Sequence, residues 1–98
     1  MADWIELLTR RVFERLVIYD TAMMRSIIKE ARKLAKRAES ISDKKEIIAT
    51  AAVIMQVKLH AIDEELNVLI TPMFYLKLCP YSNYADLRAL ELSLLEYL

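Results

Sequence analysis

Glycine is absent from this 98-residue sequence, which also has only two prolines and one cysteine. Phosphate-binding loops of the P-loop and Rossmann types need backbone positions without a Cβ, so the lack of glycine excludes both kinds of nucleotide site. The single cysteine, Cys79, cannot form an internal disulfide, and this is typical of a protein in a reducing compartment. We therefore expect a cytoplasmic protein.

Long uncharged segments are absent as well. None is longer than residues 47–57, which fall well short of the ~20 residues that span a bilayer. The N-terminus, Met-Ala-Asp-Trp, shows neither the basic nor the apolar part of a signal peptide. Asn and Gln are scarce while Lys, Arg, Glu and Ile are plentiful, a composition typical of thermophilic sources. The sequence thus predicts no membrane association and a thermophilic origin.

An overall charge is also missing, because 14 basic residues balance 14 acidic ones. The charges are nevertheless unevenly placed. Residues 25–45 hold eight Lys or Arg against three Asp or Glu, a net of +5, whereas residues 61–98 hold two against six, a net of −4. The protein therefore has no global field that attracts nucleic acid, but it has a basic middle and an acidic end.

Hydrophobic residues make up 56% of the chain, more than the usual ~45–50%. They are densest in residues 47–62, where twelve of sixteen are apolar. A helix that is apolar nearly all the way round must be covered on most of its surface. We predict that this segment is the central helix of one all-α domain, residues 1–98, and that the apolar excess packs against a second copy or a partner.

The first predicted helix starts at Asp3, which has the capping-box spacing to Glu6. Apolar residues then recur at steps of three or four, at Ile5, Leu8, Val12, Leu16, Tyr19, Met23, Ile27, Ala31, Leu34 and Ala38. This period predicts one continuous helix over residues 3–38, about 54 Å long. A kink or break near residues 19–22 is the alternative.

Three more helices follow in the predicted order. The second is capped by Ser42 or Asp43 and runs to about residue 70, with Ile48, Ala51, Met55, Leu59, Ile62, Leu66 and Leu69 on one face. Thr71-Pro72 begins a short helix that Cys79-Pro80 ends. Ser82 or Asn83 caps the last helix, whose apolar residues are Leu87, Leu90, Leu94 and Leu98, widened by Leu92 and Leu95. The predicted fold is a helical bundle of two long antiparallel helices, a short helix and a C-terminal helix, completed by oligomerisation or a partner.

A basic face on the first helix is the clearest candidate binding surface. At ~100° per residue, six cations fall together opposite the apolar stripe, namely Arg25, Lys29, Arg32, Lys33, Lys36 and Arg37. They suit the phosphate backbone of nucleic acid, or an acidic protein surface such as the C-terminal region of a second copy, with Asp63, Glu64, Glu65, Asp86, Glu91 and Glu96. A plain solvated face is the structural alternative.

Aromatic residues gather in the short connecting segment 72–84, which holds Phe74, Tyr75, Tyr81 and Tyr84. Aromatic side chains bury a large area at a small entropic cost, so they often anchor protein interfaces. The alternative is that they close one end of the protein's own bundle.

Catalytic and metal-binding patterns are weak. His60 and Glu64 have ligand spacing on one helical face, but a metal site needs three or four ligands. Cys79 has no basic neighbour closer than Lys77 to activate it. We therefore expect no enzyme, no metal, no cofactor and no small-molecule substrate.

The functional hypothesis is a non-catalytic protein-interaction subunit. It would be a homodimer or a small accessory component of a larger assembly, including one that processes nucleic acid. The alternative is a nucleic-acid-binding protein that uses the basic face of residues 25–37 on the phosphate backbone without sequence specificity.

Overall fold

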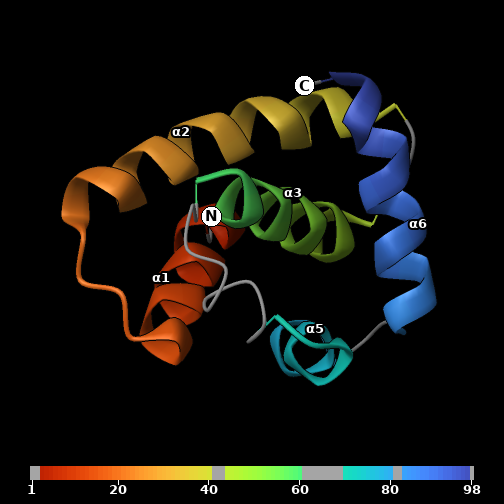
Figure 1. Ribbon diagram of the computed structural model, residues 1–98. Coiled ribbons are helices and arrows are strands. Elements are labelled where there is room, and N and C mark those ends of the chain that lie inside the picture. The colour runs from red at the N-terminus through yellow and green to blue at the C-terminus, as the bar shows by residue number, and fades with distance from the viewer. Residues whose placement is uncertain (1–2, 41–43, 61–69, 81–82, 98) are drawn as a thin grey trace.

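The computed structural model describes residues 3–40, 44–60, 70–80 and 83–97, and these residues form an all-helical fold without strands. Its elements are α1 (Trp4–Leu16), α2 (Thr21–Ala38), α3 (Lys45–His60), α5 (Pro72–Leu78), α6 (Tyr84–Leu94) and the 3₁₀ turn η1 (Leu95–Tyr97). Figure 1 shows α2 and α3 side by side and running in opposite directions, while α6 crosses the end of this pair. The predicted all-α class is confirmed.

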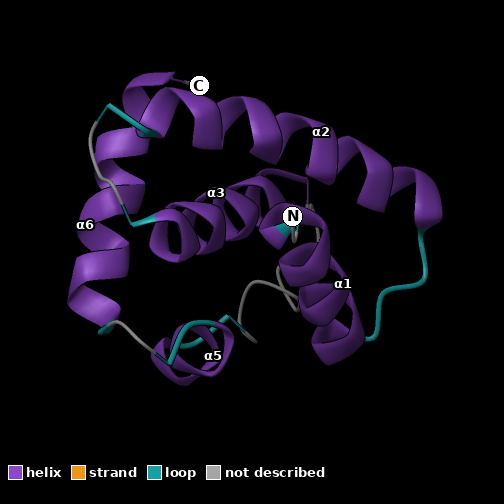
Figure 2. Cartoon of the chain, turned by 180° about the vertical axis from the view of Figure 1, so that it is seen from behind, coloured by secondary structure: helices purple, strands orange, loops and turns teal. Residues whose placement is uncertain are grey.

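Helix α3 is the central element, as the apolar run predicts. Every residue from 48 to 57 is buried, including the polar Thr50 and Gln56. Helices α1, α2 and α6 all pack against α3, and Figure 2 shows α3 enclosed between them from the opposite side. The Thr50 hydroxyl donates to the carbonyl of Glu46 at 2.7 Å, which satisfies this buried group within the helix. Residues 61–69, onto which the second helix was predicted to extend, lie outside the described residues, and Ile70 is not helical.

The prediction of one continuous helix over residues 3–38 is wrong. Helix α1 ends at Leu16, and Val17 has left-handed backbone angles of φ 55° and ψ 48°. The Ile18 amide then donates to the carbonyl of Phe13 at 2.9 Å, which closes the last turn. Asp20 starts α2 by accepting from the amide of Met23 at 3.0 Å. The alternative of a break is confirmed, although the break lies at residues 17–20 and not at 19–22.

Tertiary packing explains this break. It turns α1 back so that α1 lies against both α2 and α3 (Figure 1). The apolar side of α1 is buried there, at Ile5, Leu8, Val12, Phe13 and Leu16. A straight helix would leave these side chains without cover from their own chain, and each buried large side chain contributes about 1.5–3 kcal/mol. That contribution exceeds the helical hydrogen bonds lost at the turn.

The two later helices begin where the caps predict. The Thr71 hydroxyl accepts from the amide of Phe74 at 3.3 Å, and Pro72 follows as the first helical residue. The side chain of Asn83 accepts from the amide of Asp86 at 2.8 Å. The other candidate caps, Ser42, Asp43 and Ser82, lie outside the described residues.

The buried side of α6 differs from its predicted apolar stripe. Leu87, Leu90 and Leu94 are buried as predicted. Leu92 and Leu95, predicted to widen the stripe, are instead 57% and 55% exposed, and Glu91 is buried among the leucines. The correction follows from the helical angle, because at about 100° per residue, residue 91 lies only about 40° from residue 87 around the helix, whereas residue 92 lies about 140° from it.

Candidate interaction site

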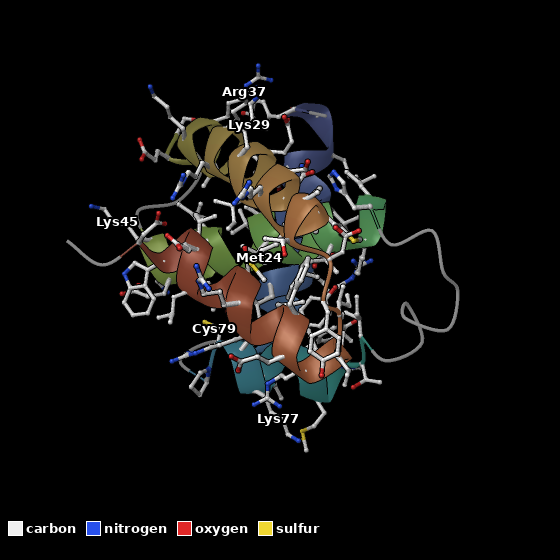
Figure 3. The ribbon with its side chains drawn as sticks, turned by 90° about the vertical axis from the view of Figure 1, so that its left-hand side faces the viewer. Met24, Lys29, Arg37, Lys45, Lys77 and Cys79 are labelled. Atoms are coloured by element: carbon white, nitrogen blue, oxygen red, sulfur yellow. The ribbon has the colours of Figure 1, made fainter. Side chains whose placement is uncertain are left out.

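The basic face of α2 points to solvent, as predicted. Its six cations, Arg25, Lys29, Arg32, Lys33, Lys36 and Arg37, are on the outer side of the helix, and none of them is buried. Figure 3 shows Lys29 and Arg37 on the outer side of α2, away from α1 and α5. This placement suits either a solvated face or a docking surface.

Half of these cations already have partners within the chain. Arg32 forms an ion pair with Asp3 and lies 3.9 Å from Glu6. The other two contacts are an ion pair between Lys33 and Glu30 at 3.6 Å and a hydrogen bond from Arg37 to the carbonyl of Tyr97 at 3.1 Å. The other three cations of this face, Arg25, Lys29 and Lys36, have no such partner within the described part of the chain.

The ion pair between α1 and α2 changes the acidity of Asp3. Burial by itself would raise the pKa of this carboxyl group. The guanidinium of Arg32 and the backbone amide of Glu6 outweigh burial, so the pKa of Asp3 is lowered below its usual value. The carboxylate therefore holds the start of α1 in two ways, as a helix cap and as the partner of a residue on α2.

The aromatic segment is placed mostly inside the protein. Phe74 and Tyr75 are buried, and the rings of Tyr75 and Tyr84 meet edge to face at a centroid distance of 5.1 Å. Tyr84 is half-buried, and Tyr81 lies outside the described residues. Phe74 and Tyr75 are therefore core side chains in this structure, which favours the alternative that they close one end of the bundle.

A recess between α3 and α6 is lined by several exposed apolar side chains. It has a volume of about 210 Å³. Its rim carries Leu59, Leu92 and Leu95, whose exposed fractions are 58%, 57% and 55%. Met55 also lines it, together with three charged residues, Lys58, Arg88 and Glu91. The sequence analysis did not predict this site.

The three charged residues form a cluster around a buried carboxylate. The side chain of Glu91 is only 4% exposed, and its Oε2 accepts from the ammonium of Lys58 at 3.2 Å and from the guanidinium of Arg88. Lys58 also donates to the hydroxyl of Tyr75 and lies 5.0 Å from the centre of that ring. The other carboxylate oxygen, Oε1, is buried and has no hydrogen-bond partner in the described structure.

Burial and the carboxylate shift the acidity of the neighbouring groups. Burial is the main reason that the pKa of Tyr75 is raised, and the negative charge of Glu91 adds to it. For Arg88, burial would lower the pKa, but the negative charge of Glu91 outweighs it and the pKa is raised. Tyr75 thus keeps its proton and Arg88 its charge. With two cations and one carboxylate, the cluster has a net charge of +1.

Two signals in the sequence pointed to this cluster. Glu91 occupies a stripe position of α6, four residues after Leu87 and three before Leu94, where an apolar residue is the norm. Lys58 follows the long uncharged run of α3. Two opposite charges in apolar surroundings on different helices are a reason to expect a buried ion pair.

The remaining candidate residues do not form a chemical site. Cys79 is buried. His60 Nδ1 lies 2.8 Å from the carbonyl of Gln56, and its candidate co-ligand Glu64 is outside the described residues. Across residues 3–40, 44–60, 70–80 and 83–97, no group of three metal-ligating side chains occurs and no helix is long and apolar enough to cross a membrane.

Comparisons with family models, with curated proteins and with solved structures gave no match to this chain.

Proposed function

We propose that this protein is a non-catalytic helical subunit that works by binding a protein partner, and that the recess between α3 and α6 is its docking site. One observation carries the proposal. Leu59, Leu92 and Leu95 are each more than half exposed and surround one recess. Clustered exposed leucines around a hollow are typical of protein-binding surfaces, whereas single exposed leucines need no explanation.

The recess provides both affinity and orientation. Covering the exposed half of each leucine contributes about 1 kcal/mol, so the three together contribute about 3 kcal/mol. The charged cluster of the recess orients the partner, because the two positive charges of Lys58 and Arg88 exceed the single negative charge of Glu91. The side chains of Lys58 and Arg88 are 33% and 38% exposed, so they keep N–H groups that a partner can reach. A partner helix that places an apolar side chain in the recess and a carboxylate beside these cations fits this surface.

The state of the ionisable groups at the recess supports binding rather than catalysis. The raised pKa of Tyr75 keeps its phenol neutral, so it is a poor base or nucleophile near neutral pH. Glu91 already accepts two charged donors through one oxygen, which makes it a structural acceptor.

The test uses a charge placed on the rim. We expect Leu92→Glu to abolish retention of the partner from an extract of the source cells, measured by quantitative mass spectrometry against immobilised wild-type protein. Ser93→Glu is the matched control, because it adds the same charge at the adjacent exposed position of α6. If Leu92→Glu and Ser93→Glu retain the same proteins as the wild type, the recess is not the docking site.

Nucleic-acid binding by α2 is the second candidate function. The observation in its favour is the row Arg25, Lys29 and Lys36, which lie on the outer side of the helix and lack acidic partners within the described residues. Three phosphate contacts would give a slope of about −3 in log K against log salt.

This candidate is tested by reversing charges on one helix at a time. We expect Lys29→Glu with Lys36→Glu to abolish binding of duplex DNA or RNA at low salt. Arg11→Glu with Arg15→Glu changes the net charge equally but on α1, and it should bind nearly as well as the wild type. Equal losses in both double variants would mean that only net charge matters, and would exclude a specific role of the α2 face.

A further inference from the structure

The connection between α1 and α2 combines strain with exposed apolar side chains. Val17 is the one residue of the described chain with positive φ, and a β-branched side chain is the least suited to that conformation. Val17 is 65% exposed and Tyr19 is 88% exposed. No glycine stands at this turn to remove the strain.

The same connection keeps a helical pattern in its sequence. Tyr19 lies three residues after Leu16 and four before Met23, so it continues the apolar stripe of α1 into α2 without a change of phase. Local sequence therefore favours one straight helix across the connection. Contacts of α1 with α2 and α3 hold it in the bent form.

We propose that two copies of this chain form a dimer by exchanging α1. In the dimer, residues 17–20 become helical, so that α1 and α2 form one straight helix in each copy. The α1 of each copy then packs on the α2 and α3 of the other copy, in the place that its own α1 occupies in the monomer.

The balance between monomer and dimer is decided at the connection. The exchanged α1 makes the same contacts in both forms, including burial of Val12 and Phe13 and the ion pair from Asp3 to Arg32. Straightening the connection removes the left-handed conformation of Val17. It also places Tyr19 on the apolar stripe of the continuous helix, where the long helices of the two copies cross. Against this stand the lost cap of Asp20 and the entropy of association. The dimer must therefore increase with protein concentration.

The first test separates the effect of backbone strain at Val17 from the effect of hydrophobic contacts made by its exposed side chain. Size-exclusion chromatography with light scattering gives the dimer dissociation constant. We expect Val17→Gly to raise this constant about 30-fold or more, because glycine removes the strain from both bent connections. Val17→Ala removes the same exposed methyl groups but keeps the Cβ, so its dimer should be as stable as the wild type or more so. A wild type that stays monomeric up to millimolar concentration, or equal losses in both variants, would overturn the proposal.

The second test asks whether α1 itself crosses between copies. Asp3→Lys and Arg32→Glu each place like charges together within a monomer. In an exchanged heterodimer of the two variants, the introduced lysine of one copy faces the introduced glutamate of the other, and the unchanged Asp3 faces the unchanged Arg32. Native mass spectrometry of the mixture should show heterodimer well above the statistical half. A statistical mixture would mean that the copies associate without exchanging α1.

This proposal is independent of the recess. Leu92→Glu should leave the dimer constant unchanged, so failure of either proposal leaves the other standing.

Discussion

Removing the ammonium of Lys58 tests whether the carboxylate of Glu91 depends on its two cations. In Lys58→Met, Glu91 keeps only Arg88, and the hydroxyl of Tyr75 loses its donor. Breaking a fully buried ion pair costs about 3–5 kcal/mol, because a charge is left without compensation. Arg88 still holds one oxygen and Lys58 is one-third exposed, so we expect about half of this cost, roughly 2 kcal/mol.

The assay is urea unfolding of the purified protein, followed by circular dichroism, with thermal unfolding as a second measure. A loss of ~2 kcal/mol lowers the unfolding midpoint by about 10 °C in a domain of this size. Lys33→Met is the matched control. Its ion pair with Glu30 is exposed on both sides, and we expect a loss within ~0.5 kcal/mol.

A double variant separates the buried charge from packing. Lys58→Met with Glu91→Met removes the carboxylate as well as its partner, and Glu91 already occupies an apolar stripe position. The double variant should therefore lose at least about 1 kcal/mol less than the sum of the losses in the single variants Lys58→Met and Glu91→Met, which is the usual coupling energy of contacting residues. If the two single losses simply add, the reasoning about the buried carboxylate is refuted.

Three further outcomes follow from the structure. The pKa of Tyr75 is raised, so its contribution to stability is present below pH ~10 and is lost as the pH rises further. Between pH 9 and 11 the urea midpoint of Tyr75→Phe should fall less than that of the wild type, and an equal fall would contradict this assignment. The pKa of Asp3 is lowered, so its contribution to stability is present above pH ~4 and is lost on acidification. Asp3→Asn keeps a cap but should lose less stability than the wild type between pH 5 and 2, and an equal loss would mean that the pair with Arg32 has no effect. Ala52 is fully buried in α3, so Ala52→Leu should cost about 1–3 kcal/mol in urea unfolding through overpacking, and an unchanged midpoint would show an unfilled core there.

The sequence alone was sufficient to predict the structure where a single local interaction determined it. The caps at Asp3, Thr71 and Asn83 start helices because a side-chain oxygen satisfies a free amide, and neighbouring segments do not alter that. The central position of α3 was also predictable, because an uncharged run with a single buried Gln56 has to be enclosed.

The sequence did not predict the structure correctly where tertiary contacts decided between two local conformations. The stripe through Tyr19 satisfies a straight helix, yet burial of α1 against α3 bends the chain at Val17. The recess was missed for a related reason. Helical spacing identifies a polar residue on an apolar stripe, such as Glu91, but it does not tell which cation on another helix meets it.

The burial of α3 on several sides has a consequence for how the chain is made. Residues 48–57 leave the ribosome after α1 and α2, so these two helices are at hand to cover them at once. The side that Leu87, Leu90 and Leu94 cover has to wait until the last helix has been synthesised. Until then the nascent chain exposes this apolar side of α3, and chaperones can recognise it at this stage of biosynthesis.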